Sequence, residues 1–371
     1  MLVTFLIFMI LFFLYVHINA HYKTSEDLEI YEMDYTTNED LQDICNVKQP
    51  TLFDFRKCYP ELFSFGGEPS PITLDKLCEK YDKYLVKVKN SNDYWTSPPQ
   101  EIVDSVPLSL GNYRTLAMTD SKSRYYTDGN EFFVEDSGLQ SIMEKTDEYL
   151  KPNYTVLKSY DMIAGTPGCK MPMQYHNHLR RFMIVSSGRI HVKMTPWKST
   201  KYLHSIKDYD NYEFRSAMNI WRPDANTDKM RSDYERIQFT DFDVHEGYVL
   251  YIPPYWWYSI QFAENTNTIL LASTYDSAIS FIANSADLAR HYIQLQNNKE
   301  VVTRTLVAEP AAPQLPLSEE KEEEMKEMPT VEYEGSEPRT ATALELVNQL
   351  QSQSVVPIRE QHEQVMQHVL G

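Results

Sequence analysis

The chain has 371 residues, 42% of them hydrophobic, which is enough to bury the core of one large domain or of two ordinary ones. Its formal net charge of −18 argues against a nucleic-acid partner, because phosphate backbones bind basic surfaces. The 26 tyrosines and 5 tryptophans favour a β-rich architecture, since aromatic side chains are enriched in strands.

Residues 1–20 form a mainly apolar run without a charged side chain, long enough to cross the hydrocarbon core of a bilayer. We predict a transmembrane anchor, and hence a single-pass membrane protein. The alternative is a cleaved signal peptide ending near Ala20, which would make the protein secreted. The anchor is favoured because no Lys or Arg precedes the apolar run.

The four cysteines do not indicate a zinc site, because none belongs to a C-x-x-C pair. Three of them lie in the first third of the chain. The sequence leaves two alternatives: one disulfide among these three cysteines, or free buried thiols.

A polar, acidic segment without periodicity, residues 21–50, predicts a stalk before a folded domain at 51–298. Helical spacing predicts helices over 73–84, with Thr73 as the N-cap, and over 137–150. Short apolar runs predict a strand core at 154–275. Its strands are expected over 154–163, 182–185, 190–194, 249–252, 256–262 and 268–273. A long tyrosine-rich insertion, 201–241, interrupts them.

The C-terminal part of the chain begins with an amphipathic pattern at 278–296, which predicts a helix that closes the sheet or mediates a homodimer. Residues 299–371 follow, with prolines and the charge run SEEKEEEMKE. Such a composition predicts a disordered acidic tail. Within it, 340–353 and 357–370 are expected to form short amphipathic helices that a partner could bind.

The most informative stretch is EGYVLYIPPYWWYSI, residues 246–260. A glycine precedes a short buried strand, a Pro-Pro turn follows, and aromatic residues begin a second strand. This stretch resembles the second half of the metal-binding motif of the JmjC-like cupins, the cupin-like group beside the asparaginyl hydroxylases. The resemblance implies a mainly β fold, the double-stranded β-helix of cupins and jelly rolls, with flanking helices. In that family a histidine that binds iron follows the Trp pair, whereas Tyr258 follows it here.

The first half of the motif corresponds to QYHNHLRR, residues 174–181. Counting back from Gly188, the family's spacing places the other two iron ligands at Tyr175 and Asn177, which are not usual ligands of iron. The position that would bind 2-oxoglutarate is Ile190, which cannot pair with a carboxylate. The resemblance therefore implies a pseudoenzyme with no catalytic residue, metal or cofactor. Its pocket, suited to an anionic or sugar-like group, would be formed by Tyr175, Asn177, Arg181 and Tyr258.

His176 and His178 provide an alternative, because their spacing places both on one face of a strand. A slip of one residue would turn them inward as ligands for Fe(II), with His191 or His245 as a third nitrogen. The protein would then be an Fe(II)- and 2-oxoglutarate-dependent hydroxylase. The spacing to Gly188 favours the outer face of the strand for both histidines.

The run PWKSTKYLHSIKDYDNYEFRSAMNIW, residues 196–221, adds a resemblance to cupin-like membrane proteins of large DNA viruses. In those proteins the same ligands tend to be replaced. Together, these features predict a membrane-anchored, catalytically degenerate cupin-like protein in a host or virion membrane. It would act by binding an unknown protein or small molecule, or as a structural component.

Overall fold

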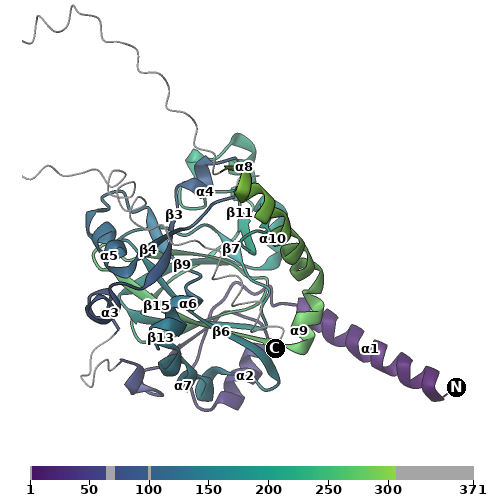
Figure 1. Cartoon of the computed structure of the whole chain (residues 1–371). Helices are drawn as coiled ribbons and strands as arrows, with labels where there is room; N and C mark the ends of the chain where they lie inside the picture. The colour runs from purple at the N-terminus through teal and green to yellow at the C-terminus, as the bar shows by residue number, and fades with distance from the viewer. Residues whose placement is uncertain (1, 64–71, 99–101, 306–371) are drawn as a thin grey trace, which may run out of the picture. The chain divides into compact units, whose positions relative to one another are not determined.

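A computed structural model describes residues 2–63, 72–98 and 102–305 of the chain. The chain divides into two units, residues 1–294 and 295–371, and both sheets belong to the first unit. This unit mixes helices and strands and is organised around two large, mainly antiparallel sheets, with one apolar helix at the N-terminus (Figure 1).

The larger sheet has nine strands, and the smaller has six. The order in the larger sheet is β1 (Tyr31–Glu32), β2 (Thr51–Asp54), β13 (Tyr248–Ile252), β8 (Arg180–Ser187), β15 (Thr268–Ser277), β6 (Thr155–Gly165), β5 (Tyr125–Thr127), β3 (Leu85–Asn90) and β4 (Val106–Ser109). The order in the smaller sheet is β10 (Ser205–Asp208), β11 (Glu213–Ser216), β7 (Gln174–Tyr175), β14 (Trp257–Phe262), β9 (Arg189–Thr195) and β12 (Thr240–His245). All six predicted core strands are confirmed, as β6, β8, β9, β13, β14 and β15.

Helices surround the sheets. The α-helices are α1 (Leu2–Tyr22), α2 (Asn38–Asn46), α3 (Leu74–Tyr81), α4 (Asp93–Thr96), α5 (Leu110–Thr119), α6 (Glu131–Asp136), α7 (Gln140–Leu150), α8 (Asp228–Tyr234), α9 (Ala278–Ala283) and α10 (Ser285–Thr305). The described residues also contain the short 3-10 helices η1 (Pro60–Phe63), η2 (Trp197–Tyr202) and η3 (Pro223–Ala225). The predicted helices over 73–84 and 137–150 correspond to α3 and α7, and the Thr73 hydroxyl caps α3 by accepting from the Lys76 amide. Helix α1 is long and apolar enough to span a membrane, a property that a signal sequence shares.

Two glycines lie at turns where the chain crosses from one sheet to the other. Gly188, between β8 and β9, has a φ of 82°, and a Cβ there would lie 2.5 Å from the Thr268 hydroxyl. Gly247, between β12 and β13, has a φ of 88°. Only glycine adopts this left-handed backbone without strain, so these residues permit each crossing within a tight turn.

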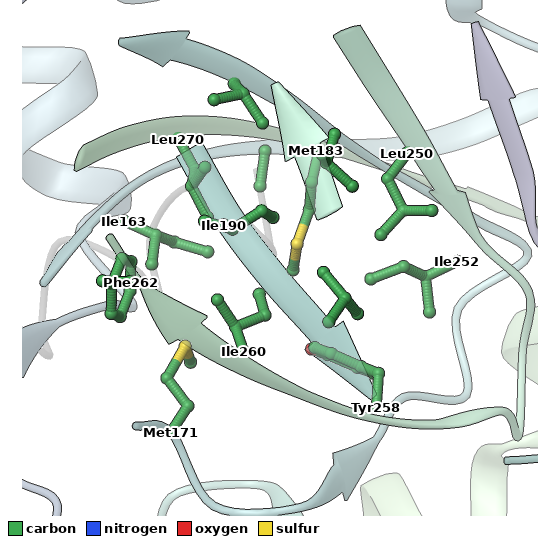
Figure 2. Close-up of a cluster of buried hydrophobic side chains, with 14 of the residues drawn as sticks. Ile163, Met171, Met183, Ile190, Leu250, Ile252, Tyr258, Ile260, Phe262 and Leu270 are labelled. Atoms are coloured by element: carbon green, nitrogen blue, oxygen red, sulfur yellow. The ribbon is translucent and has the colours of Figure 1, made fainter. Parts of the chain in front are cut away.

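The core lies between the two sheets. Alternate side chains of β8 and β13 in the larger sheet contact those of β9 and β14 in the smaller one, because successive side chains of a strand point to opposite faces. Figure 2 shows this cluster, which includes Met183, Leu250, Ile190, Ile260 and Phe262. Its side chains are almost fully buried, and each contributes about 1.5–3 kcal/mol of stability.

The predicted stalk over 21–50 is wrong, because this segment is folded into the domain. Strand β1 pairs in parallel with β2, and α2 buries Leu41 and Cys45. The Arg180 guanidinium donates to the Asn46 side chain at 2.6 Å. Only two side chains of α2 are buried, too few to produce a visible apolar period in an acidic segment.

The domain is also larger than the predicted core at 154–275, since five strands of the larger sheet come from residues 31–127. The insertion at 201–241 carries β10, β11 and α8 and covers a second buried cluster. The four cysteines are free, as one of the two alternatives predicted.

The single helix predicted over 278–296 is instead two helices, α9 and α10, separated at Asn284. The Asn284 side chain bonds to Tyr255 and to the backbone of Asn177 rather than continuing a helical face. The predicted tail begins within α10, and its charge run and two short helices lie outside the described residues.

Candidate functional site

Tyr258 lies in β14 at one end of the core cluster, next to Ile252 and Ile260 (Figure 2). Its hydroxyl accepts a hydrogen bond of 3.3 Å from Nε2 of Gln174, on the paired strand β7. Burial raises the pKa of Tyr258, although the nearby charge of Arg181 opposes this shift. Tyr258 is therefore a neutral hydroxyl in the interior between the sheets.

His176 lies beside Tyr258, with 6.4 Å between the ring centroids. Its Nε2 lies 3.0 Å from the carbonyl oxygen of Ile252, which can only accept, so this nitrogen carries the proton. Burial, and then the charges of His178 and Arg181, hold the pKa of His176 well below its ordinary value. Its Nδ1 is buried and has no hydrogen-bond partner among the described residues. The side chain is thus neutral and faces the interior.

Arg181 begins the inward-facing series of β8 that continues with Met183 and Val185. Burial lowers its pKa, but the neighbouring Tyr258, Asp161 and Asp128 raise it by more, so the guanidinium stays charged. Asp161 faces the same interior from β6 and accepts from the amides of Gly129, at 3.0 Å, and Asn130, at 2.7 Å. Burial raises the pKa of Asp161 to about 6, although Arg181 lowers it. At neutral pH, Arg181 and Asp161 therefore carry opposite charges in one enclosed region.

A second set of charges adjoins the first through Asp128. Lys89, almost fully buried on β3, pairs with Asp128 at 2.6 Å and forms a second, shorter pair with Glu213. Burial lowers the pKa of Lys89, but the two carboxylates raise it well above its ordinary value. The Tyr94 hydroxyl donates to Glu213 at 3.1 Å. We call Gln174, His176, Tyr258, Arg181, Asp161, Lys89, Asp128 and Glu213 the interior polar cluster.

The structure does not bring the four predicted pocket residues together. Arg181 and Tyr258 belong to the interior polar cluster, but Tyr175 lies on the other side of the smaller sheet. The Tyr175 ring stacks on Phe214, with centroids 5.0 Å apart, and meets Trp257 edge-on at 4.7 Å. Tyr175 is therefore a core residue beneath the insertion rather than part of a pocket with Tyr258.

Asn177 is a connector between segments. Its side-chain amide donates to the Tyr212 hydroxyl at 3.0 Å. Its carbonyl oxygen accepts from Asn284 at 2.8 Å and lies 3.2 Å from Nε2 of His21, at the end of α1. Asn177 thereby joins the N-terminal helix to the link between α9 and α10.

The expectation that His176 lies on the outer face is wrong, and the cause is a break in the strand. β7 ends at Tyr175 and belongs to the smaller sheet, whereas β8 begins at Arg180 in the larger one. The alternation of inward and outward side chains, counted back from Gly188, holds only along a continuous strand. It therefore fails at the bend between β7 and β8. His178 lies in this bend, and its Nδ1 is 2.6 Å from Oδ2 of Asp276.

No sequence pattern predicted that Lys89, Asp128, Glu213 or Asp161 would lie in the interior. Lys89 follows two buried valines in an alternating strand, and Glu213 lies in a polar insertion. The contacts of Glu213 with Lys89 and Tyr94 join segments more than 100 residues apart, which periodicity cannot reveal.

No family model and no curated protein matches this sequence.

The residues near His176 do not fit an iron site. Asp276, the carboxylate that a His-His-carboxylate set would use, pairs with His178 and accepts from the Leu179 amide at 3.0 Å and the Ser280 hydroxyl at 2.9 Å. Nε2 of His176 bonds to Ile252. Across the residues that the structure describes, no group of three or more His, Cys, Asp or Glu side chains could hold a metal ion.

Proposed function

We propose that the protein is a membrane-anchored structural or binding protein built on a double-stranded β-helix, without the iron site of the hydroxylases whose motif its sequence resembles. The support for this fold is the path of the chain between the sheets. From β6 to β9, successive strands lie alternately in the larger and the smaller sheet, and β12 to β15 repeat this alternation. Such alternation is the pattern expected when one chain winds through two facing sheets.

One observation carries the proposed loss of catalysis: most polar groups of the interior bond to one another, and only Nδ1 of His176 and Nε of Arg181 in the interior polar cluster are buried without a hydrogen-bond or ion-pair partner among the described residues. Lys89 pairs with Asp128 and Glu213, Tyr94 donates to Glu213, and Gln174 donates to Tyr258. These hydrogen bonds and ion pairs offset the free-energy cost of burying the polar groups, and they hold the two sheets in one arrangement. They would have to separate before a metal or substrate could bind among them.

Helix α1 supports the membrane anchor by its length and apolar composition. In this proposal the folded unit follows the anchor closely, since β1 begins nine residues after the end of α1 and α2 begins sixteen residues after it. The secreted alternative requires that α1 be cleaved as a signal sequence.

A second candidate, the Fe(II)- and 2-oxoglutarate-dependent hydroxylase, has one observation in its favour. His176 faces the interior, and its Nδ1 has no partner among the described residues. In this reading Nδ1 of His176 and Nε2 of His178 would bind iron. The remaining ligands would require Asp276 to leave its present hydrogen bonds.

Metal analysis of the full chain in detergent separates the two candidates. After anaerobic loading with Fe(II) and desalting, we expect no stoichiometric iron. Fe(II) with 2-oxoglutarate should produce no thermal shift, since a ligand stabilises only a state that it binds. Stoichiometric iron that is lost in the variant His176→Ala with His178→Ala would establish the hydroxylase instead. The variant His204→Ala is the matched control, because His204 pairs with Asp233 within the insertion and belongs to neither proposed ligand set.

A further inference from the structure

The C-terminal end of α1 packs against α9 and against Tyr255, which in turn contacts η2. The hydroxyl of Tyr22, the last residue of α1, lies 2.5 Å from the carbonyl oxygen of Ala283, the last residue of α9. The Tyr255 ring contacts Tyr22, with centroids 5.8 Å apart, and Trp197 of η2, at 5.4 Å. Helix α1, α9 and η2 therefore meet at Tyr255, as the position of α9 beside α1 in Figure 1 illustrates.

Apolar side chains remain exposed around this junction. Tyr22 is 46% exposed, Trp197 37%, Phe281 47% and Ile282 44%. We call these four residues the collar. Trp and Tyr favour the interfacial layer of a bilayer, where one end of the ring is apolar and the other is hydrated. An exposed apolar surface that surrounds a membrane-spanning helix is thus suited to contact with lipid.

A basic hollow lies next to the collar, because η2 contributes to both. The hollow has a volume of about 130 Å³ and is lined by Lys198, Ser199, Lys201, Tyr202, Arg236 and Gln238. Lys201 and Arg236 lie over the Tyr202 ring, at 4.8 Å and 5.8 Å from its centroid. Neither forms a salt bridge within the described part of the chain. This concentration of positive charge occurs in a protein whose net charge is −18.

The hollow is also close to the end of α1 along the chain. Nζ of Lys198 donates to the carbonyl oxygen of Glu26 at 3.3 Å. Glu26 follows Tyr22 by four residues, which span at most about 14 Å when fully extended. If α1 crosses a bilayer, the hollow lies at the depth of the lipid headgroups or just outside it.

We propose that the collar and the basic hollow form one membrane-docking surface. The collar inserts into the interfacial layer, and Lys201 and Arg236 bind the phosphate of an anionic phospholipid, whereas Lys198 is paired with Glu26. This inference rests on the proposed role of α1 as a membrane anchor. It adds that the folded unit is held against the bilayer rather than tethered at a distance from it.

Quenching of Trp197 by lipid tests the proposal. The full chain is reconstituted into vesicles of phosphatidylcholine with brominated acyl chains, with or without phosphatidylglycerol. The contribution of Trp197 is the difference between the natural protein and Trp197→Phe. We expect bromine to quench this component, with quenching at least about twofold stronger when phosphatidylglycerol is present, because anionic lipid attracts basic residues.

Charge reversal identifies the residues responsible. The variant Lys201→Glu with Arg236→Glu should reduce the quenching to the level seen without phosphatidylglycerol. The matched control, Lys122→Glu with Lys145→Glu, changes the net charge equally at exposed positions elsewhere and should leave the quenching unchanged. Equal quenching in both lipid mixtures, or full quenching in the Lys201 and Arg236 variant, would overturn the binding of anionic lipid.

Two further results separate this inference from the anchor itself. If carbonate extracts the chain from the vesicles, α1 is not a membrane anchor, and the proposed docking surface is wrong as well. Resistance to carbonate without any quenching of Trp197 would leave the anchor in place and overturn the docking surface. In that case, disulfide dimers of the variant Phe281→Cys would assign the collar to a second copy of the chain.

Discussion

Nδ1 of His178 lies 2.6 Å from Oδ2 of Asp276, which joins the bend between β7 and β8 to the end of β15. The other oxygen of the Asp276 carboxylate accepts from the Leu179 amide and the Ser280 hydroxyl. Burial alone would raise the pKa of Asp276, but His178 and these hydrogen bonds lower it from 3.8 to about 2. This carboxylate therefore stabilises the fold only while it is ionised.

The pH dependence of stability tests this contact. An aspartate whose pKa is lowered in the folded state contributes stability above its unfolded pKa of 3.8, and that contribution is lost as the pH falls through about 2. The variant Asp276→Asn should lack this contribution, which is roughly 2 kcal/mol. Melting temperatures measured between neutral pH and pH 2 should therefore fall less steeply for the variant. Parallel curves for the two proteins would show that Asp276 has no such role.

Removal of the buried lysine should be strongly destabilising. The variant Lys89→Met leaves the carboxylates of Asp128 and Glu213 buried without a cation, which costs about 3–5 kcal/mol. Adding Glu213→Gln removes one of the two uncompensated charges and should recover part of the loss. The free energy of unfolding from urea titrations measures both variants. If the double variant loses as much stability as the two separate changes added together, the buried charges are not coupled.

The orientation of β7 predicts which substitutions can create a metal site. Gln174, His176 and Tyr258 face the same interior, whereas Tyr175 does not. The variant Gln174→His with Tyr258→His places two imidazoles near His176 and should bind Co(II) with the absorption of a nitrogen-ligated ion. The control Tyr175→His with Tyr258→His should bind none, and it should be less stable because it disrupts the aromatic cluster. Equal binding by both variants would place Tyr175 in the interior.

Deletion of residues 2–20 should release the protein from membranes in a carbonate wash, because α1 is the apolar span found among the described residues. His21 and Tyr22 are retained, so their contacts with Asn177 and Ala283 are preserved. Near-ultraviolet circular dichroism checks that the truncated chain is folded. If the truncated chain is folded but still resists carbonate, another segment anchors it.

The strands of the core were predictable because each is a continuous buried run bounded by turn residues, as in 249–252 before Pro253. The direction of individual side chains was predictable only within a strand. Tyr258 was placed correctly in the interior. Tyr175 and His176 were assigned to the wrong faces, because the bend between β7 and β8 interrupts the alternation of side chains. The charges around Lys89 and Glu213 could not be predicted, since their pairing depends on tertiary contacts between polar segments.

The position of β15 has a consequence for the order in which the protein forms. β15, the last strand that the structure describes, pairs with β8 on one side and β6 on the other, so the larger sheet cannot close until residue 277 has been synthesised. Ser277 follows Tyr22 by 255 residues, which take on the order of 10–50 s to translate at about 5–20 residues per second. If α1 is the membrane anchor proposed above, it would engage a membrane well before that time. The folded unit would then assemble at the membrane surface, from a chain already held at its N-terminus.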